Sequence, residues 1–267
     1  MTTHVLCDEN IICTENYGYG INYTEDKKIY FKYEQYIILG VADGHGGTDK
    51  ISLFIADHVP QLFVQMFPLY KHNLEILLDI LFCELHSRIE EYSKLNNING
   101  GSTLSLCVID TITNIITISN LGDSVIMILR HNNNSYYILD HTLKVRNIQA
   151  PNIVIAGFGD IYDVSLNRTP FIISHQLMPT DYILITSDGL YEEYDFDTQK
   201  LLGSRSNEHI LFDFNEVTKY TNSLSTITEY LINQQVKHIM LQLQIKYSES
   251  DILRAFDNHM IILYHHK

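Results

Sequence analysis

Four apolar, β-branched stretches of the sequence adjoin an aspartate. Three of them end at the acid, at Asp43, Asp123 and Asp188, and the fourth begins with Asp257. If these stretches are neighbouring strands, the four carboxylates converge at one edge of a sheet. Carboxylates about 4 Å apart repel each other by roughly 4 kcal/mol at an effective dielectric constant of about 20. No Lys or Arg adjoins any of the four acids, so we expect a hard divalent cation with oxygen ligands to bind among them.

The composition narrows the classes of function. The chain of 267 residues is 45% hydrophobic and 19% charged, which is ordinary for a globular protein with a sizeable core. Its formal net charge of -14 disfavours nucleic acid and anionic membranes as partners, because both are negatively charged. The N-terminal segment lacks the basic region of a signal peptide, and no apolar run approaches the roughly 20 residues of a membrane helix. We expect a monomeric, cytoplasmic or nuclear protein with no nucleic-acid or membrane partner.

The cysteines give no sign of a disulfide framework or of a zinc site. Cys7, Cys13, Cys83 and Cys107 form no CxxC pair and have no ligand-like spacing to a histidine. This scatter is typical of thiols in a reducing compartment. We expect all four to be buried and reduced.

The spacing of apolar residues predicts the elements that position the acids. Helical stripes predict helices over 51–66, 74–92 and 215–247, with Pro60 kinking or restarting the first. Alternating and continuous apolar runs predict strands over 29–33, 36–42, 102–110, 114–120, 124–130, 136–140, 181–187 and 260–266. Residues 141–180 are expected to form an irregular surface loop. This order is not the regular βαβ alternation, and it favours one α+β domain over 1–267, with two mainly antiparallel sheets flanked by helices.

Five short blocks occur along the chain in a characteristic order, and the acidic segment TED (24–26) precedes them. The blocks are VADGHGG (41–47), GSTLSL (101–106), NLGDS (120–124), SDGLYE (187–192) and DNHMII (257–262). They resemble the signature blocks of the metal-dependent serine/threonine phosphatases of the protein phosphatase 2C type. The resemblance runs from Glu25 to the C-terminus. It implies a four-layer α-β-β-α sandwich with two Mn²⁺ or Mg²⁺ ions between the sheets at one end.

The same resemblance implies unequal roles for the residues that hold the ions. Asp43 would bridge the two ions, and Asp188 and Asp257 would complete the shell of the first. Glu25 and the carbonyl of Gly44 would hold the second ion.

Two further acids have weaker or indirect roles in this assignment. Asp26 would order water around the ions, and Asp123 together with Asp188 would form a weaker third metal site. Each of these residues also has an ordinary structural interpretation. Glu25 and Asp26 are compatible with a solvated acidic pair on a loop, and Asp123 with a hairpin turn.

The implied reaction is hydrolysis of phosphomonoesters in phosphoserine and phosphothreonine proteins. Two bridged divalent ions make hydroxide available near neutral pH to attack phosphorus in line. The leaving alkoxide needs a proton, and His45, two residues beyond Asp43, is the expected general acid. A backbone hydrogen bond within the glycine turn is the structural alternative for His45.

One position departs from the family's pattern. The family has an Arg four residues before the first acid of its opening pair, where the guanidinium holds the substrate phosphate. Here that residue is Ile21, so a cation of the 141–180 loop, Lys144, Arg146 or Arg168, substitutes for it, or the metals alone bind phosphate. The substitution also supports an alternative function, a catalytically weak, phosphatase-like binding or regulatory module that retains its metal sites. A calcium-binding protein is disfavoured, because the acids are spread far beyond a single 12-residue loop of the EF-hand type.

Overall fold

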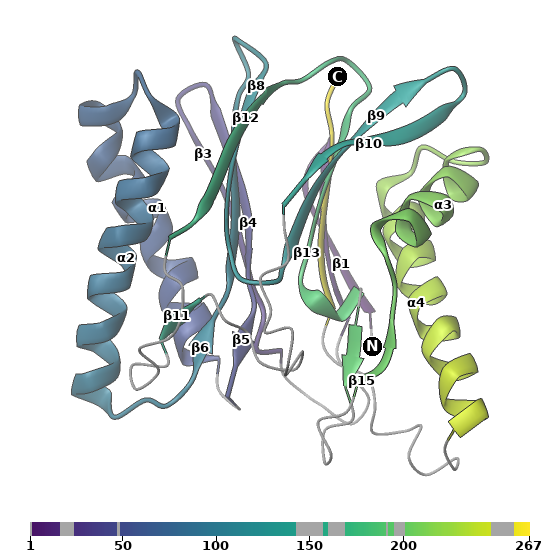
Figure 1. Ribbon diagram of the computed structural model, residues 1–267. Helices are drawn as coiled ribbons and strands as arrows, with labels where there is room; N and C mark the ends of the chain where they lie inside the picture. The colour runs from purple at the N-terminus through teal and green to yellow at the C-terminus, as the bar shows by residue number, and fades with distance from the viewer. Residues whose placement is uncertain are drawn as a thin grey trace.

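Two β-sheets pack face to face between two pairs of helices. Figure 1 shows the four layers in the order helix pair, sheet, sheet, helix pair. The structure is a computed structural model and describes residues 2–16, 24–46, 49–142, 157–159, 169–190, 192–194, 201–246 and 259–267. Every strand pair among these residues is antiparallel. The predicted α+β sandwich of two antiparallel sheets is therefore confirmed.

One sheet has six strands and joins both ends of the described chain. Its order is β1-β2-β16-β13-β9-β10. The strands are β1 (Thr2–Asp8), β2 (Ile11–Asn16), β16 (His259–His265), β13 (Tyr182–Thr186), β9 (Val125–Asn132) and β10 (Ser135–His141). The N-terminal hairpin β1–β2 was not predicted from the sequence.

The other sheet has five strands in the order β12-β8-β7-β4-β3. They are β12 (Phe171–Gln176), β8 (Ile115–Leu121), β7 (Leu104–Asp110), β4 (Tyr36–Ala42) and β3 (Lys27–Tyr33). Three very short strands extend one end of the molecule as the sheet β11-β6-β5, with bounds Phe158–Gly159, Gly101–Ser102 and Gly44–His45. Strands β14 (Glu192–Tyr194) and β15 (Leu201–Ser204) form a separate pair.

Each helix pair covers the outer face of one sheet. Helices α1 (Lys50–Tyr70) and α2 (Leu74–Asn96) pack on the five-stranded sheet, and α3 (Asn207–Thr218) and α4 (Leu224–Lys246) pack on the six-stranded sheet. The Asn73 side chain caps α2 by accepting a hydrogen bond of 3.1 Å from the Ile76 N–H. Asn97 ends it in the left-handed conformation, at φ 51°. None of the described helices is long and apolar enough to cross a membrane.

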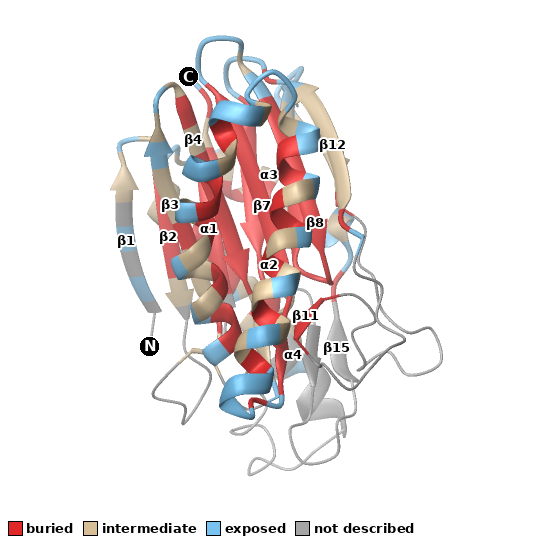
Figure 2. Cartoon of the chain, turned by 90° about the vertical axis from the view of Figure 1, so that its left-hand side faces the viewer, coloured by how far each residue is buried: buried red, intermediate tan, exposed pale blue. Residues whose placement is uncertain are grey.

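Three apolar layers hold the sandwich together. One lies between α1–α2 and the five-stranded sheet, one between the two sheets, and one between the six-stranded sheet and α3–α4. Figure 2 shows buried residues on the strands behind α1 and α2, and exposed residues on the outer surface of both helices. Because the central strands are covered on both faces, their sequences are continuous apolar runs, as in VIMIL of β9 and YILI of β13.

The structure corrects several details of the predicted elements. Helix α1 continues through Pro60, so the predicted restart there is wrong. The predicted helix over 215–247 is wrong as a single element, because α3 ends before residues 219–223 and α4 begins after them. In this break the side chains of Thr221 and Ser223 accept hydrogen bonds from backbone N–H groups. Part of the predicted loop over 141–180 is strand β12, which acquires its structure by pairing along β8. The sequence of this segment alone does not predict its pairing with β8, a strand distant from it in the chain.

The prediction that all four cysteines are buried is also wrong. Cys13 and Cys107 are buried, Cys7 is half-buried and Cys83 is exposed. Cys83 lies on α2, where Leu81, Phe82 and Leu85 occupy the buried side. All four thiols are free.

The apolar layer beneath α2 predicts a selective loss of stability. Leu81 is fully buried, whereas Leu95 on the same helix is 77% exposed. Leu81→Ala should lower the free energy of unfolding by about 2 to 5 kcal/mol, because it removes buried methyl groups and leaves a cavity. Leu95→Ala should change it by about 0.5 kcal/mol or less. Urea denaturation measures both, and equal losses in the two variants would contradict the packing described here.

Candidate active site

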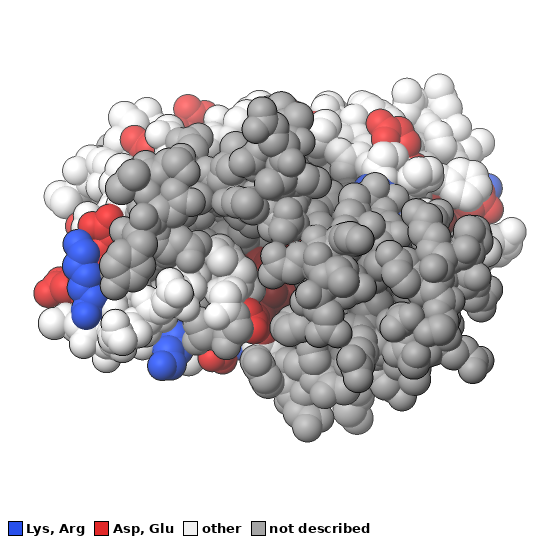
Figure 3. All heavy atoms as spheres, turned by 60° about the horizontal axis from the view of Figure 1, so that its bottom comes forward, with Lys and Arg blue, Asp and Glu red and all other residues white. Residues whose placement is uncertain are grey.

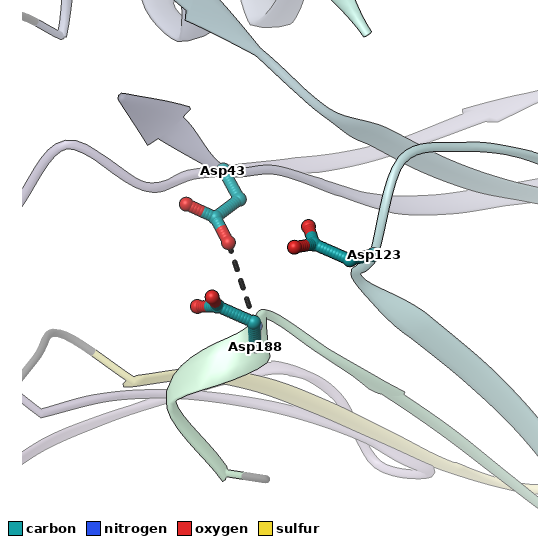
Figure 4. A group of neighbouring side chains, drawn as sticks. All are labelled: Asp43, Asp123 and Asp188. Atoms are coloured by element: carbon teal, nitrogen blue, oxygen red, sulfur yellow. Dashed lines mark hydrogen bonds between the residues drawn. The ribbon is translucent and has the colours of Figure 1, made fainter. Parts of the chain in front are cut away.

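Three of the aspartates predicted from the sequence converge at one end of the sandwich. One carboxylate oxygen from each of Asp43, Asp123 and Asp188 lies within 4.8 Å of the others. Asp43 follows β4 of the five-stranded sheet, and Asp188 begins a short 3-10 turn after β13 of the six-stranded sheet. Asp123 lies in the turn by which the chain crosses from β8 to β9, and so from one sheet to the other. Figure 4 shows the three side chains pointing toward the space between them.

Backbone hydrogen bonds and backbone conformation hold the residues that carry these carboxylates. The Asp43 carbonyl accepts a hydrogen bond of 2.8 Å from the Thr103 N–H. The Asp188 N–H points to the Oδ2 atom of Asp43 at 3.4 Å, the dashed contact in Figure 4. Gly122, just before Asp123, has a φ of +118°, a conformation that residues with a side chain rarely adopt. Asp123 is 1% exposed, so its carboxylate is almost entirely removed from water.

Asp26 adds a fourth acid beside this group. Its side chain is 3% exposed, and its Oδ2 atom has no hydrogen-bond partner among the described residues. Burial raises the pKa of the Asp26 carboxyl from 3.8 to about 7; Asp43 and Ser187 oppose that rise and the charge of Asp188 adds to it. A divalent cation among these oxygens would compensate the buried negative charge, so the residues fit a metal centre.

Glu25 lies next to Gly44, and these are the two residues that the sequence resemblance assigns to a second ion. A Cβ atom added to Gly44 would lie 2.7 Å from the Glu25 carbonyl oxygen and 3.2 Å from the Glu25 Cβ. Only glycine fits there. The Ser52 hydroxyl, at the start of α1, donates to the same Glu25 carbonyl and so attaches this loop to the helix.

His45 occupies the short strand β5 and is half-buried. It pairs with Gly101 of β6, two residues before Thr103. Gly46 follows with a φ of +87°, and a Cβ atom there would lie 2.8 Å from the Gly100 Cα. The glycines at positions 44 and 46 therefore allow the segments around Glu25 and Gly100 to pack closely against β5. This packing restrains the strand that carries His45.

Lys27 and Lys28 begin β3, and Lys50 begins α1, at this end of the described chain. Figure 3 shows acidic atoms recessed near the centre of this face, with visible Lys and Arg atoms toward its edge. Lys27 is the first residue of β3. Its ammonium group donates a hydrogen bond to the Thr24 carbonyl at 2.7 Å and forms an ion pair with Asp49 at 3.1 Å.

Several predicted residues lie outside the described part of the chain. These are Asp257, Ile21, Lys144, Arg146 and Arg168. The assignment of Asp257 to the first ion, and the choice of cation that holds the phosphate, therefore stay predictions.

Sequence reasoning missed the hydroxyl groups that support the acids. Thr103, Ser124 and Ser187 are each 2% exposed or less. Ser187 forms two hydrogen bonds with the backbone of Met260 in β16, at 3.0 and 3.1 Å, and it contacts the Asp26 carboxyl. All three hydroxyl residues belong to the sequence blocks, but only the acids of those blocks suggested chemistry.

Comparison with known proteins supports the assignment of the fold. No protein-family model matches the sequence, and neither does any curated protein. Solved structures do match, and the fold that they share with this chain is that of the protein phosphatase 2C-type serine/threonine phosphatases.

Three of these structures show the extent of the likeness. Serine-threonine phosphatase 2C from Toxoplasma gondii has a TM-score of 0.67 and 15% identity, over 100% of this chain and 99% of that chain. RsbX in complex with magnesium has a TM-score of 0.54 and 14% identity, over 99% of both chains. A sex determining protein of C. elegans has a TM-score of 0.64 and 16% identity, over 96% of this chain. The chain spans 65% of the length of that C. elegans protein.

The acid group predicts a specific response to Mn²⁺. A cation that binds only the folded state stabilises it by about 2.7 kcal/mol at a concentration 100-fold above its Kd, so Mn²⁺ should raise the melting temperature. Asp43→Asn and Asp188→Asn should remove most of that rise. In EDTA the same variants should melt at or above the wild-type temperature, because each removes one of the mutually repelling charges.

A matched substitution separates this effect from the general loss of an acid. Asp57 is exposed on α1, and Asp57→Asn should keep the full response to Mn²⁺. Differential scanning fluorimetry with Mn²⁺ and with EDTA measures all four proteins. A wild-type protein that melts at the same temperature in both buffers would argue against a metal centre.

Proposed function

We propose that this protein is a Mn²⁺- or Mg²⁺-dependent protein serine/threonine phosphatase. The observation that carries the proposal is the convergence of Asp43, Asp123 and Asp188, contributed by both sheets, at one end of a fold shared with such phosphatases. The buried, partnerless Oδ2 atom of Asp26 beside them supports a cation at this place.

The proposed ligands are the carboxylates and the one carbonyl that the sequence resemblance assigns. Asp43, Asp188 and Asp257 would hold one ion, and Asp43, Glu25 and the Gly44 carbonyl the other. Asp123 and Asp188 would hold a weaker third ion. When bound, such ions lower the pKa of coordinated water and neutralise charge on phosphate oxygens. The all-oxygen donor set favours Mn²⁺ and Mg²⁺ over softer metals.

His45 is the proposed general acid. A serine or threonine alkoxide is strongly basic, so its departure from phosphorus is assisted by a proton donor in the transition state. An imidazole titrates near neutral pH and can carry that proton. His45 is two residues after Asp43 in the chain and lies in β5. The close packing at the flanking Gly44 and Gly46 supports this proposed role, because it restrains the segment that carries His45.

The substrates in this proposal are phosphoserine and phosphothreonine proteins. We propose that the chain acts as a single domain and as a monomer in the cytoplasm or nucleus, without nucleic-acid or membrane partners. Its net charge of -14 supports the exclusion of polyanions.

The general-acid role of His45 predicts a dependence on the leaving group. With Mn²⁺, His45→Gln should slow hydrolysis of a phosphothreonine peptide by roughly 10²- to 10⁴-fold. Hydrolysis of p-nitrophenyl phosphate should slow far less, because nitrophenolate departs as a stable anion without a proton. His72→Gln, an exposed histidine between α1 and α2, should match the wild type on both substrates. Equal losses on the two substrates would exclude the proton-donor role, and wild-type turnover in EDTA would exclude the metal mechanism.

A second candidate is a catalytically weak binding or regulatory module with the same fold. The observation that favours it is Ile21, at the position where the family pattern has its phosphate-binding Arg. Titration calorimetry with Mn²⁺ and phosphopeptide assays on the same sample separate the two functions. Tight Mn²⁺ binding without turnover of any phosphopeptide would favour the module.

A further inference from the structure

Two buried hydroxyl groups connect the sheets directly beside the acids. The Thr103 Oγ1 and Ser124 Oγ atoms lie 2.7 Å apart in a hydrogen bond, and the two residues are 2% and 0% exposed. Thr103 lies between β6 and β7, next to the five-stranded sheet. Ser124 immediately precedes β9 of the six-stranded sheet. The hydrogen bond therefore spans the two halves of the sandwich.

Each hydroxyl belongs to a residue that is attached to one of the acids. The Thr103 N–H donates to the Asp43 carbonyl at 2.8 Å, and Ser124 is the next residue after Asp123 in the chain. The path from one acid to the other thus consists of a backbone hydrogen bond, a side-chain hydrogen bond and a single peptide link. A shift of β9 relative to β7 cannot separate Asp123 from Asp43 without breaking one of these two hydrogen bonds.

A separate pair of contacts sets the shape of the turn that carries Asp123. The Asn120 side chain donates to the Gly122 carbonyl at 3.3 Å and accepts from the Ser105 hydroxyl. Both partners of that second bond lie in the five-stranded sheet. Asn120 therefore supports the conformation of the turn from the side of the five-stranded sheet. The contact between Thr103 and Ser124 ties the far side of the turn, at β9, to the Asp43 segment.

We propose that Thr103 and Ser124 are positioning residues for the metal centre, which hold Asp43 and Asp123 at cation-binding separation against their mutual repulsion. This inference rests on the proposed metal-dependent function. Neither hydroxyl needs to contact an ion or a substrate for this role. Groups that orient metal ligands typically change metal affinity by 10- to 100-fold when they are removed.

The chain contains a matched hydroxyl pair that serves as a control. Thr14 Oγ1 and Thr228 Oγ1 lie 2.9 Å apart, and both residues are fully buried. This bond joins β2 to α4, across the helix-covered face of the six-stranded sheet. Thr228→Val breaks this bond between two buried hydroxyl groups, as Thr103→Val breaks the bond to Ser124, but the control bond involves neither Asp43 nor Asp123.

The test compares the Mn²⁺ affinity of folded variants by titration calorimetry well below their melting temperatures in EDTA. Thr103→Val and Ser124→Ala should each raise the Kd for Mn²⁺ by about 10- to 100-fold. Thr103→Ser should keep the wild-type Kd, because it retains the hydroxyl. Thr228→Val should lower the melting temperature in EDTA and leave the Kd unchanged. The double variant of Thr103→Val and Ser124→Ala should bind no more weakly than the weaker single variant, because both remove the same bond.

The outcomes separate this inference from the function on which it rests. A wild-type Kd in Thr103→Val and Ser124→Ala overturns the positioning role alone, and so does an equal loss of affinity in Thr228→Val. A wild-type protein that binds no Mn²⁺ overturns the metal centre, and the positioning role with it. If Thr103→Val does not fold, Ser124→Ala carries the test, since it removes only one oxygen atom.

Discussion

The repulsion among carboxylates brought together by two different sheets is the constraint on which this structure depends. Asp43, Asp123 and Asp188 present oxygen atoms within 4.8 Å of one another, and Asp26 lies buried beside them. Without a cation, each ionised pair at such a separation costs about 4 kcal/mol at an effective dielectric constant of about 20. Three apolar layers hold the sheets and helices in place around this end of the molecule. The stability of the sandwich thus offsets a local arrangement that is unfavourable by itself.

This constraint explains why buried hydroxyl groups form hydrogen bonds around the acids. Thr103, Ser124 and Ser187 connect strand ends that belong to different parts of the sheets. Glycine is needed at positions 44 and 46, where a side chain would collide with neighbouring backbone. A cation inserted among the acids would convert the repulsion into attraction, and the same hydrogen bonds would then keep the ligands in one geometry.

The convergence of Asp43, Asp123 and Asp188 was predictable because strand ends are visible in the sequence, whereas their roles as metal ligands stay predictions. Continuous apolar runs identify the strands that are covered on both faces, and Asp43 and Asp188 directly follow such runs. The hydroxyl pair was not predictable in the same way, because Thr103 and Ser124 meet only once the two sheets are packed together. Strand β12 and the hairpin β1–β2 were missed for a related reason, since their structure comes from pairing with β8 and β16. The separation of α3 from α4 depends on local capping by short polar residues, which a search for helical stripes passes over.

In our proposal, divalent cations bind between the sheets at this group of acids. Diffraction from a crystal of the wild-type protein grown with Mn²⁺, measured at the manganese absorption edge, locates such cations. We expect anomalous difference peaks among the side chains of Asp43, Asp123 and Asp188, and their loss in crystals of Asp43→Asn. Well-ordered carboxylates with no anomalous peak between them at millimolar Mn²⁺ would contradict the proposal.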